Sequence, residues 1–137
     1  MDESQLHPRW SKPLGVALLL FGALTIKEGG SVILGDAAAL AGAGAYVPFV
    51  VWFNAVAGFA YIAAAIGIWR DARWSAALAV ALAAATLVVF AAFGVHVLRG
   101  GAYEVRTVAA MTFRSAVWLA VAALVWRRWH APPAQLA

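Results

Sequence analysis

Long hydrophobic runs alternate with short polar segments along the chain, and this pattern predicts four membrane-spanning helices. Three runs, residues 48–69, 74–98 and 106–128, are long enough to cross a hydrocarbon layer of about 30 Å, which takes roughly 20 helical residues. The first run, residues 11–28, lies near the lower limit for a span. Because charged residues follow its apolar core where a signal-peptide cleavage site would need small ones, we interpret this run as a retained helix.

Glycine, proline and charged residues mark the predicted boundaries between the spans. Gly29 and Gly30 are expected to break the first helix, since glycine is a poor helix former. The Ala/Gly-rich segment after them is expected to form a short interfacial helix or a re-entrant segment packed on the bundle. Pro48 suits the first turn of the second helix, where its missing N–H would have no partner anyway. Residues 70–73 are expected to form a tight turn between the second and third helices.

Composition indicates the same class of protein. Of the 137 residues, 65% are hydrophobic and 12% are charged, and the mean hydropathy is +0.85. A soluble domain of this length could not bury so much apolar surface. We therefore expect an all-α integral membrane protein, a four-helix transmembrane bundle that forms a single domain over residues 1–137. The chain has no cysteine, which excludes disulfides and cysteine-ligated metals.

Positive residues and tryptophans predict the orientation in the membrane. Six cations fall at one face if the chain crosses four times: Arg9, Lys12, Arg70, Arg73, Arg127 and Arg128. Five of the seven tryptophans fall at the same face as an aromatic belt: Trp10, Trp69, Trp74, Trp126 and Trp129. The positive-inside rule makes that face cytoplasmic, so we expect an inner-membrane protein with both termini in the cytoplasm. The net charge of +4 is thus explained by orientation, and no nucleic-acid partner is expected.

Polar residues of all four predicted helices are expected to meet near the opposite, outer face. On the fourth helix, Glu104, Thr107 and Arg114 recur at helical spacing and share one face. If the bundle turns such faces inward, it encloses a polar chamber in its outer half above an apolar inner half. The predicted ligand-binding residues are Glu28, Asn54, Tyr61, His96, Glu104, Thr107, Met111 and Arg114.

Arg114 is the most informative of these residues because it lies far inside a predicted span. If the helix begins near Arg106, Arg114 is roughly 12 Å from the helix end. A charge at the centre of a span costs about 2.5–3.5 kcal/mol, and each Val, Leu or Phe in the span returns roughly 0.3–0.6 kcal/mol. The guanidinium therefore needs a partner. It can be a structural charge paired with Glu28 or Glu104, or it can face a ligand, and the sequence leaves both interpretations open.

The other candidates also have plain structural interpretations. Asn54 and Tyr61 could hydrogen-bond between helices, His96 could face water, and Met111 could be packing. Lys27 and Arg106 are expected to reach toward lipid headgroups. The histidines lack the repeated spacing of a metal site, and His7 and His130 belong to the face opposite His96, which argues against haem. We therefore predict no catalytic residue and no metal site. An enzymatic role is not required by any motif and stays open.

Two short motifs occur in the first two predicted helices. Gly22 is followed by Lys27 near the end of the first, and Asn54, Gly58 and Gly67 are spaced along the second. Together with the topology, these motifs resemble the DoxX-like group of small four-helix membrane proteins. Asn54 stands where that group tends to have an acidic residue, and the Gly22–Lys27 spacing is wider than usual. The group is associated with membrane redox chemistry, so the resemblance implies a quinone cofactor or an accessory role, with proton transfer in doubt.

Three hypotheses for function follow. The first is an outward-facing polar pocket that binds a small amphipathic ligand, a quinone or a lipid head, or an accessory subunit of a membrane redox complex. The second is a dimeric transporter of small solutes or ions, motivated by Gly29, Gly30 and the re-entrant alternative. The third is a structural helix-packing module that uses small residues to contact a partner. Its residues are Ala77, Ala81, Ala84, Ala85 and Ala92 of the third helix. Besides the lipid bilayer, the expected partners are a second copy of the chain or another membrane subunit.

Overall fold

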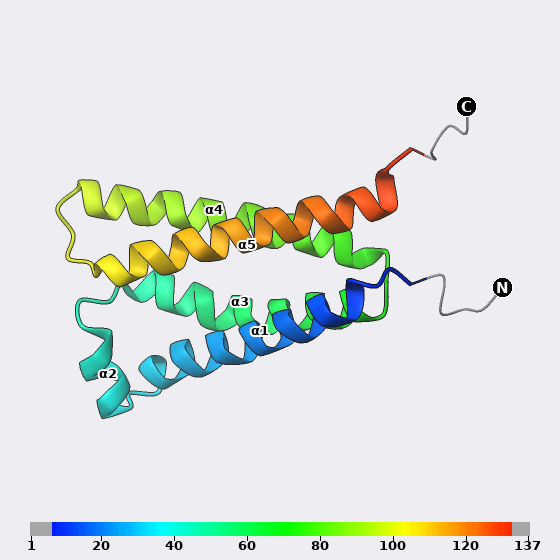
Figure 1. Cartoon of the computed structure of the whole chain (residues 1–137). Helices are drawn as coiled ribbons and strands as arrows, with labels where there is room; N and C mark the ends of the chain where they lie inside the picture. The colour runs from blue at the N-terminus through cyan, green and yellow to red at the C-terminus, as the bar shows by residue number, and fades with distance from the viewer. Residues whose placement is uncertain (1–6, 133–137) are drawn as a thin grey trace.

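The computed structural model describes residues 7–132, and this part of the chain forms five helices and no strand (Figure 1). In chain order the helices are α1 (Ser11–Ile33), α2 (Ala37–Ala43), α3 (Pro48–Trp69), α4 (Trp74–Leu98) and α5 (Val105–His130). All except α2 are long and apolar enough to cross a membrane. The predicted all-α class is therefore confirmed, and the chain is a multi-pass membrane protein.

The helix bounds agree closely with the prediction except at the end of α1. The helices α3 and α4 have the predicted bounds, and Pro48 occupies the first turn of α3 as expected. The predicted break at Gly29 and Gly30 is wrong, because α1 continues through both glycines to Ile33. Gly29 is buried against Ala55 of α3. The absence of a side chain at Gly29 therefore allows α1 and α3 to approach closely and does not turn the chain.

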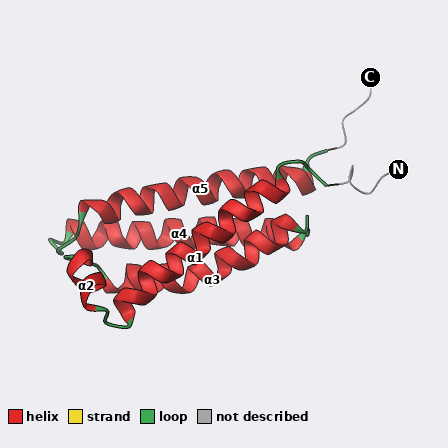
Figure 2. Ribbon diagram, turned by 60° about the horizontal axis from the view of Figure 1, so that its bottom comes forward, coloured by secondary structure: helices red, strands yellow, loops and turns green. Residues whose placement is uncertain are grey.

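The short helix α2 lies outside the four long helices, which favours the interfacial over the re-entrant alternative (Figures 1 and 2). It crosses the end of the bundle outside the four long helices (Figures 1 and 2). The side chain of Asp36 caps its first turn by accepting a 2.9 Å hydrogen bond from the backbone N–H of Ala39. Gly44, with a φ of 62°, ends the helix in a conformation that favours glycine.

The four long helices form two pairs, α1 with α3 and α4 with α5, and α3 also contacts α4 (Figure 1). Glycines at seven-residue intervals bring α1 close to α3: Gly15, Gly22 and Gly29. A Cβ atom on Gly22 would lie 3.0 Å from the carbonyl oxygen of Gly58 on α3. This spacing keeps all three glycines on the α3-facing side of α1 because it is close to two helical turns.

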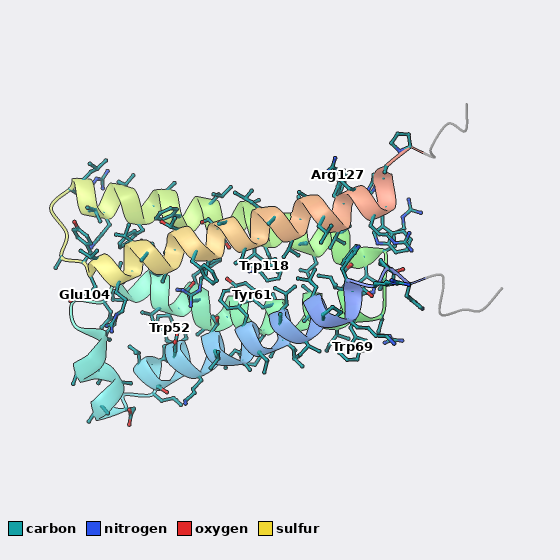
Figure 3. The ribbon with its side chains drawn as sticks, in the orientation of Figure 1. Trp52, Tyr61, Trp69, Glu104, Trp118 and Arg127 are labelled. Carbon is teal, nitrogen blue, oxygen red and sulfur yellow. The ribbon has the colours of Figure 1, made fainter. Side chains whose placement is uncertain are left out.

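The two ends of the bundle differ in packing. The terminal end comprises the start of α1, the α3–α4 turn and the end of α5, with Trp69 and Arg127 nearby (Figure 3). The larger apolar cluster lies between this end and the middle of the bundle and includes Ile68, Leu82 and Val125. The opposite end, called the α2 end here, has only a smaller cluster of four buried residues: Val47, Val50, Phe93 and Met111. The apolar core is therefore concentrated away from α2.

Candidate functional site

A cavity of about 550 Å³ opens at the α2 end, between α1, α2, α3 and α5. It forms because α1 packs along α3 and α5 packs along α4, whereas the backbones of α1 and α5 stay farther apart. Towards the middle of the bundle the gap narrows at the aromatic rings of Phe21 on α1 and Phe113 on α5, whose centroids are 5.9 Å apart. The cavity is thus a space between two helix pairs that α2 partly covers.

Five of the eight predicted ligand-binding residues line this cavity: Glu28, Asn54, Thr107, Met111 and Arg114. They come from α1, α3 and α5, the helices whose polar faces were expected to meet. The helical spacing of Thr107, Met111 and Arg114 does place them on one face of α5. Their role in binding stays a prediction.

The other three predicted residues do not line the cavity. Tyr61 is fully buried deeper in the bundle, where its ring lies 4.7 Å from that of Trp118 (Figure 3). A ring nitrogen of His96 is 3.0 Å from the carbonyl oxygen of Ala102, so this side chain in the last turn of α4 binds the α4–α5 loop. Glu104 lies just before α5 and turns toward the loop that precedes α3. His96 and Glu104 lie at helix ends, next to loops. Their side chains therefore make hydrogen-bond contacts with loop backbone and do not extend into the cavity.

The guanidinium of Arg114 lies on the cavity wall with weak compensation for its charge. Arg114 is nine residues beyond Val105, the first residue of α5, or roughly 13 Å along the helix at 1.5 Å per residue. The residue is 8% exposed. Its Nη2 atom is 3.8 Å from Oε2 of Glu28, whose side chain is 73% exposed. Of the two carboxylates expected to pair with Arg114, Glu28 is the neighbour, at a distance too long for a strong charge-assisted hydrogen bond.

Buried polar atoms without a hydrogen-bond partner gather around Arg114. Within residues 7–132 they belong to Thr25, Asn54, Tyr61, Thr86, Arg114, Ser115 and Trp118. The Tyr61 hydroxyl has Thr86, Trp118 and Arg114 as electrostatic neighbours. The Arg114 Nε and Trp118 Nε1 groups can only donate, so they need an acceptor. An unsatisfied buried polar group costs about 1–3 kcal/mol, which makes this region expensive as a purely structural core.

Five cavity-lining residues with polar side-chain groups were not among the predicted ligand contacts: Thr25, Lys27, Ser31, Tyr46 and Arg106. Lys27 and Arg106 were expected to reach lipid headgroups. The signal that could have placed Arg106 correctly is its spacing, because Arg106, Ala110 and Arg114 are four residues apart and share one helix face. Thr86, which is buried but does not line the cavity, carried a weaker signal, as a hydroxyl in the middle of an alanine-rich span.

The start of α5 holds α2 over the cavity. Oε1 of Glu104 accepts a 2.8 Å hydrogen bond from the backbone N–H of Ala45, and Arg106 donates to the carbonyl oxygen of Gly42. Gly42 lies in the last turn of α2 and Ala45 follows the helix, so both hydrogen bonds hold the end of α2. Figure 3 shows Glu104 beside this end. The cover of the cavity is therefore attached to α5, across the gap from α1.

Fold and cavity together define the class: a four-helix multi-pass membrane protein with a cavity at one end of the bundle. No family model matches the chain, and neither a curated protein nor a solved structure is significantly similar to it. The resemblance to the DoxX-like group stays a prediction. Among residues 7–132, no three His, Cys, Asp or Glu side chains are grouped closely enough to hold a metal ion.

Proposed function

We propose that this chain is an inner-membrane protein whose cavity faces the outside and binds a small amphipathic ligand, a quinone or a lipid head. The orientation rests on the six cations already named, which belong to segments at the terminal end of the bundle. Both termini are then cytoplasmic, and α2 lies at the outer membrane surface. The cavity volume of about 550 Å³ falls within the range of ligand sites, roughly 300–1,000 Å³.

The observation that carries this proposal is the buried guanidinium of Arg114 on the wall of a cavity that also has apolar walls. Val47, Val50 and Met111 are nearly fully buried and also line the cavity. A ligand with a polar head and an apolar body fits both kinds of wall, because its head can meet Arg114 and its body the valine and methionine side chains. An ionisable group inside a span most often marks a functional site.

The redox association comes from the resemblance to the DoxX-like group alone. It favours a quinone as the ligand and an accessory role beside a partner membrane subunit. No residue is proposed as catalytic, and the chemistry of any redox step would belong to the partner.

Thermal unfolding of the full chain in detergent tests the proposal. A benzoquinone with a decyl tail and a lysophospholipid are the probes, and at least one should raise the Tm. A ligand at a hundred times its Kd stabilises by about 2.7 kcal/mol. The variant Arg114→Ala should fold but lose this shift, whereas the control Val88→Ala, at an exposed position on α4 that does not line the cavity, should keep it. If Arg114→Ala unfolds while Arg114→Lys binds as the original chain does, Arg114 is structural.

A second candidate is the helix-packing module, because part of the predicted alanine face on α4 is uncovered. Ala77, Ala81, Ala84 and Ala92 are exposed along α4. Small residues at such spacing let two helices approach closely in lipid. Native mass spectrometry would reveal a homodimer or a partner complex, and a strictly monomeric chain would count against it. The transport hypothesis has lost one of its two motives, since α1 is unbroken at Gly29 and Gly30, and the other is weakened because α2 lies outside the four long helices (Figure 1).

A further inference from the structure

The charged residues on the cavity wall are mostly cations. Lys27, Arg106 and Arg114 line the cavity, and Glu28 is the one acidic residue among the described residues that line it. The wall therefore carries a formal charge of +2, from three cations and one carboxylate. A cavity with this charge concentrates anions, and partial exclusion of water strengthens the attraction.

The unpartnered groups at the inner end of the cavity independently require an acceptor. Arg114 lines the cavity, its side chain is 10% exposed, and its Nε has no hydrogen-bond partner. Thr25 also lines the cavity with a buried and unpartnered hydroxyl. The amide of Asn54 can present either its oxygen or its NH₂ group. Thr25, Asn54 and Arg114 all line the cavity and all carry hydrogen-bond donors, so an occupant with oxygen acceptors suits this wall.

We propose that the inner end of the cavity is an anion site, where a carboxylate or phosphate group binds the guanidinium of Arg114 between Thr25 and Asn54. The inference rests on the proposed function in that the same cavity takes up the ligand, and it names the chemistry of the ligand's head. A planar guanidinium suits the two oxygens of either anion. A neutral quinone presents one carbonyl oxygen at a time, so it would accept fewer hydrogen bonds from these donors and would not neutralise the guanidinium.

Glu28 is the residue that an incoming anion must compete with. Its carboxylate lies 3.8 Å from Nη2 of Arg114, and its side chain is 73% exposed. A pair of this length and exposure is weak, because water solvates the carboxylate and screens the attraction. The geometry lets a ligand anion replace Glu28 at the guanidinium while Glu28 remains in water. Glu28 therefore lowers the affinity of the site for anions.

The experiment measures binding to the full chain in neutral detergent with three matched probes. Dodecyl phosphate carries both head and tail, inorganic phosphate carries the head alone, and dodecanol carries the tail with an uncharged head. Each Kd is measured for the original chain, Arg114→Gln, Glu28→Gln and Arg99→Gln. Arg99 is the control, because it is an exposed cation at the α2 end of the bundle that does not line the cavity.

The expected pattern is specific. Arg114→Gln should weaken binding of dodecyl phosphate by roughly tenfold or more, and Glu28→Gln should tighten it about threefold. Arg99→Gln should leave the Kd unchanged. If Arg114→Gln does not fold, Glu28→Gln decides alone: tighter binding supports the anion site, and an unchanged Kd overturns it. Equal weakening by Arg99→Gln overturns it as well, since the attraction would then be general.

The three probes separate failure of this inference from failure of the proposed function. Dodecanol binding as tightly as dodecyl phosphate would overturn the anion site and leave an amphipathic pocket in place. Inorganic phosphate binding as tightly as dodecyl phosphate, with the same dependence on Arg114, would support the anion site. That result would assign the site to a free anion and remove the amphipathic ligand. Tightest binding of dodecyl phosphate supports both proposals and a lipid head as the source.

Discussion

The two sides of α1 have opposite relations to their neighbours. Towards α3 the helix presents Gly15, Gly22 and Gly29, and the two backbones approach until a single added methyl group would collide. Towards α5 it presents Phe21 and Glu28, and the helices stay apart around a cavity of about 550 Å³. One face of α1 therefore packs closely on α3, and another face lines the cavity.

This difference separates a side of α1 that stabilises the fold by close packing from a side that borders a cavity. In lipid, close packing between small residues holds helices together without a hydrophobic driving force. The α1–α3 contact can therefore fix the position of α1, and the side facing α5 is left free to carry charged and polar groups. The site is costly in itself, because it includes a buried charge and unpartnered donors.

The largest expected effect comes from filling the packed side. Gly22→Leu should lower the free energy of unfolding by about 3 kcal/mol, the upper part of the usual range for overpacking. Even its Cβ would lie 3.0 Å from the Gly58 carbonyl oxygen and 3.1 Å from the Cβ of Tyr61. Unfolding of the purified chain in mixed micelles measures the change.

The matched control is Gly30→Ala on the same helix, where a Cβ would meet nothing within 4 Å. This change should raise stability by about 0.5–1 kcal/mol, because alanine is the better helix former. Similar losses for both variants would mean that glycine content, and not the α3 contact, matters in α1.

The next effect concerns the cavity between α1 and α5, and here the substitution is expected to raise the free energy of unfolding. Arg114→Met should increase the free energy of unfolding by about 1–3 kcal/mol, as replacement of buried ionic groups by apolar ones often does. Methionine removes a charge whose partner is 3.8 Å away and mostly exposed. A loss of stability in the same micelle assay would show that Arg114 holds the helix pairs together, and the contrast between the two sides of α1 would fail.

A smaller effect is expected at the cover of the cavity. Glu104→Gln weakens the acceptor of the Ala45 N–H, and the cost should be about 1 kcal/mol or less. Hydrogen–deuterium exchange should rise in α2 and in the loop that follows it, while α1 and α3 keep their protection. Unchanged exchange in α2 would mean that the Glu104 hydrogen bond does not hold the cover.

The smallest effect is expected for Glu28→Gln. Because the carboxylate is 73% exposed, the stability should change by no more than about 0.5 kcal/mol. A loss well above this value would make the Glu28–Arg114 pair structural and would bring α1 and α5 into one packed unit. The same unfolding assay as for Gly22→Leu provides the measurement.

Most of the fold was predictable because hydrophobic length and charged turns determine membrane spans. The bounds of α3 and α4 follow from Pro48, the turn before Trp74 and the glycines after Arg99. Gly29 and Gly30 misled the prediction, because glycine disrupts helices in water but is tolerated within membrane helices. The seven-residue glycine pattern that includes Gly15 was present in the sequence and would have indicated the α1–α3 contact.

The site was predictable in part for a related reason. Helical spacing was sufficient for Thr107, Met111 and Arg114, which lie well inside one helix. It was insufficient for His96 and Glu104, because residues at helix ends are oriented by loop backbone that periodicity does not describe. The choice between Glu28 and Glu104 as the neighbour of Arg114 likewise depended on how the helices pair, which no local pattern encodes.

The glycine contact also has a consequence for the order of assembly during synthesis. Chains are made from the N-terminus, so α1 and α3 can complete their contact before α5 has left the ribosome. Arg114 then enters the membrane beside a preformed surface that already presents Glu28 and Asn54. Of the four long helices, the one that carries the buried guanidinium is thus made after the two that supply Glu28 and Asn54.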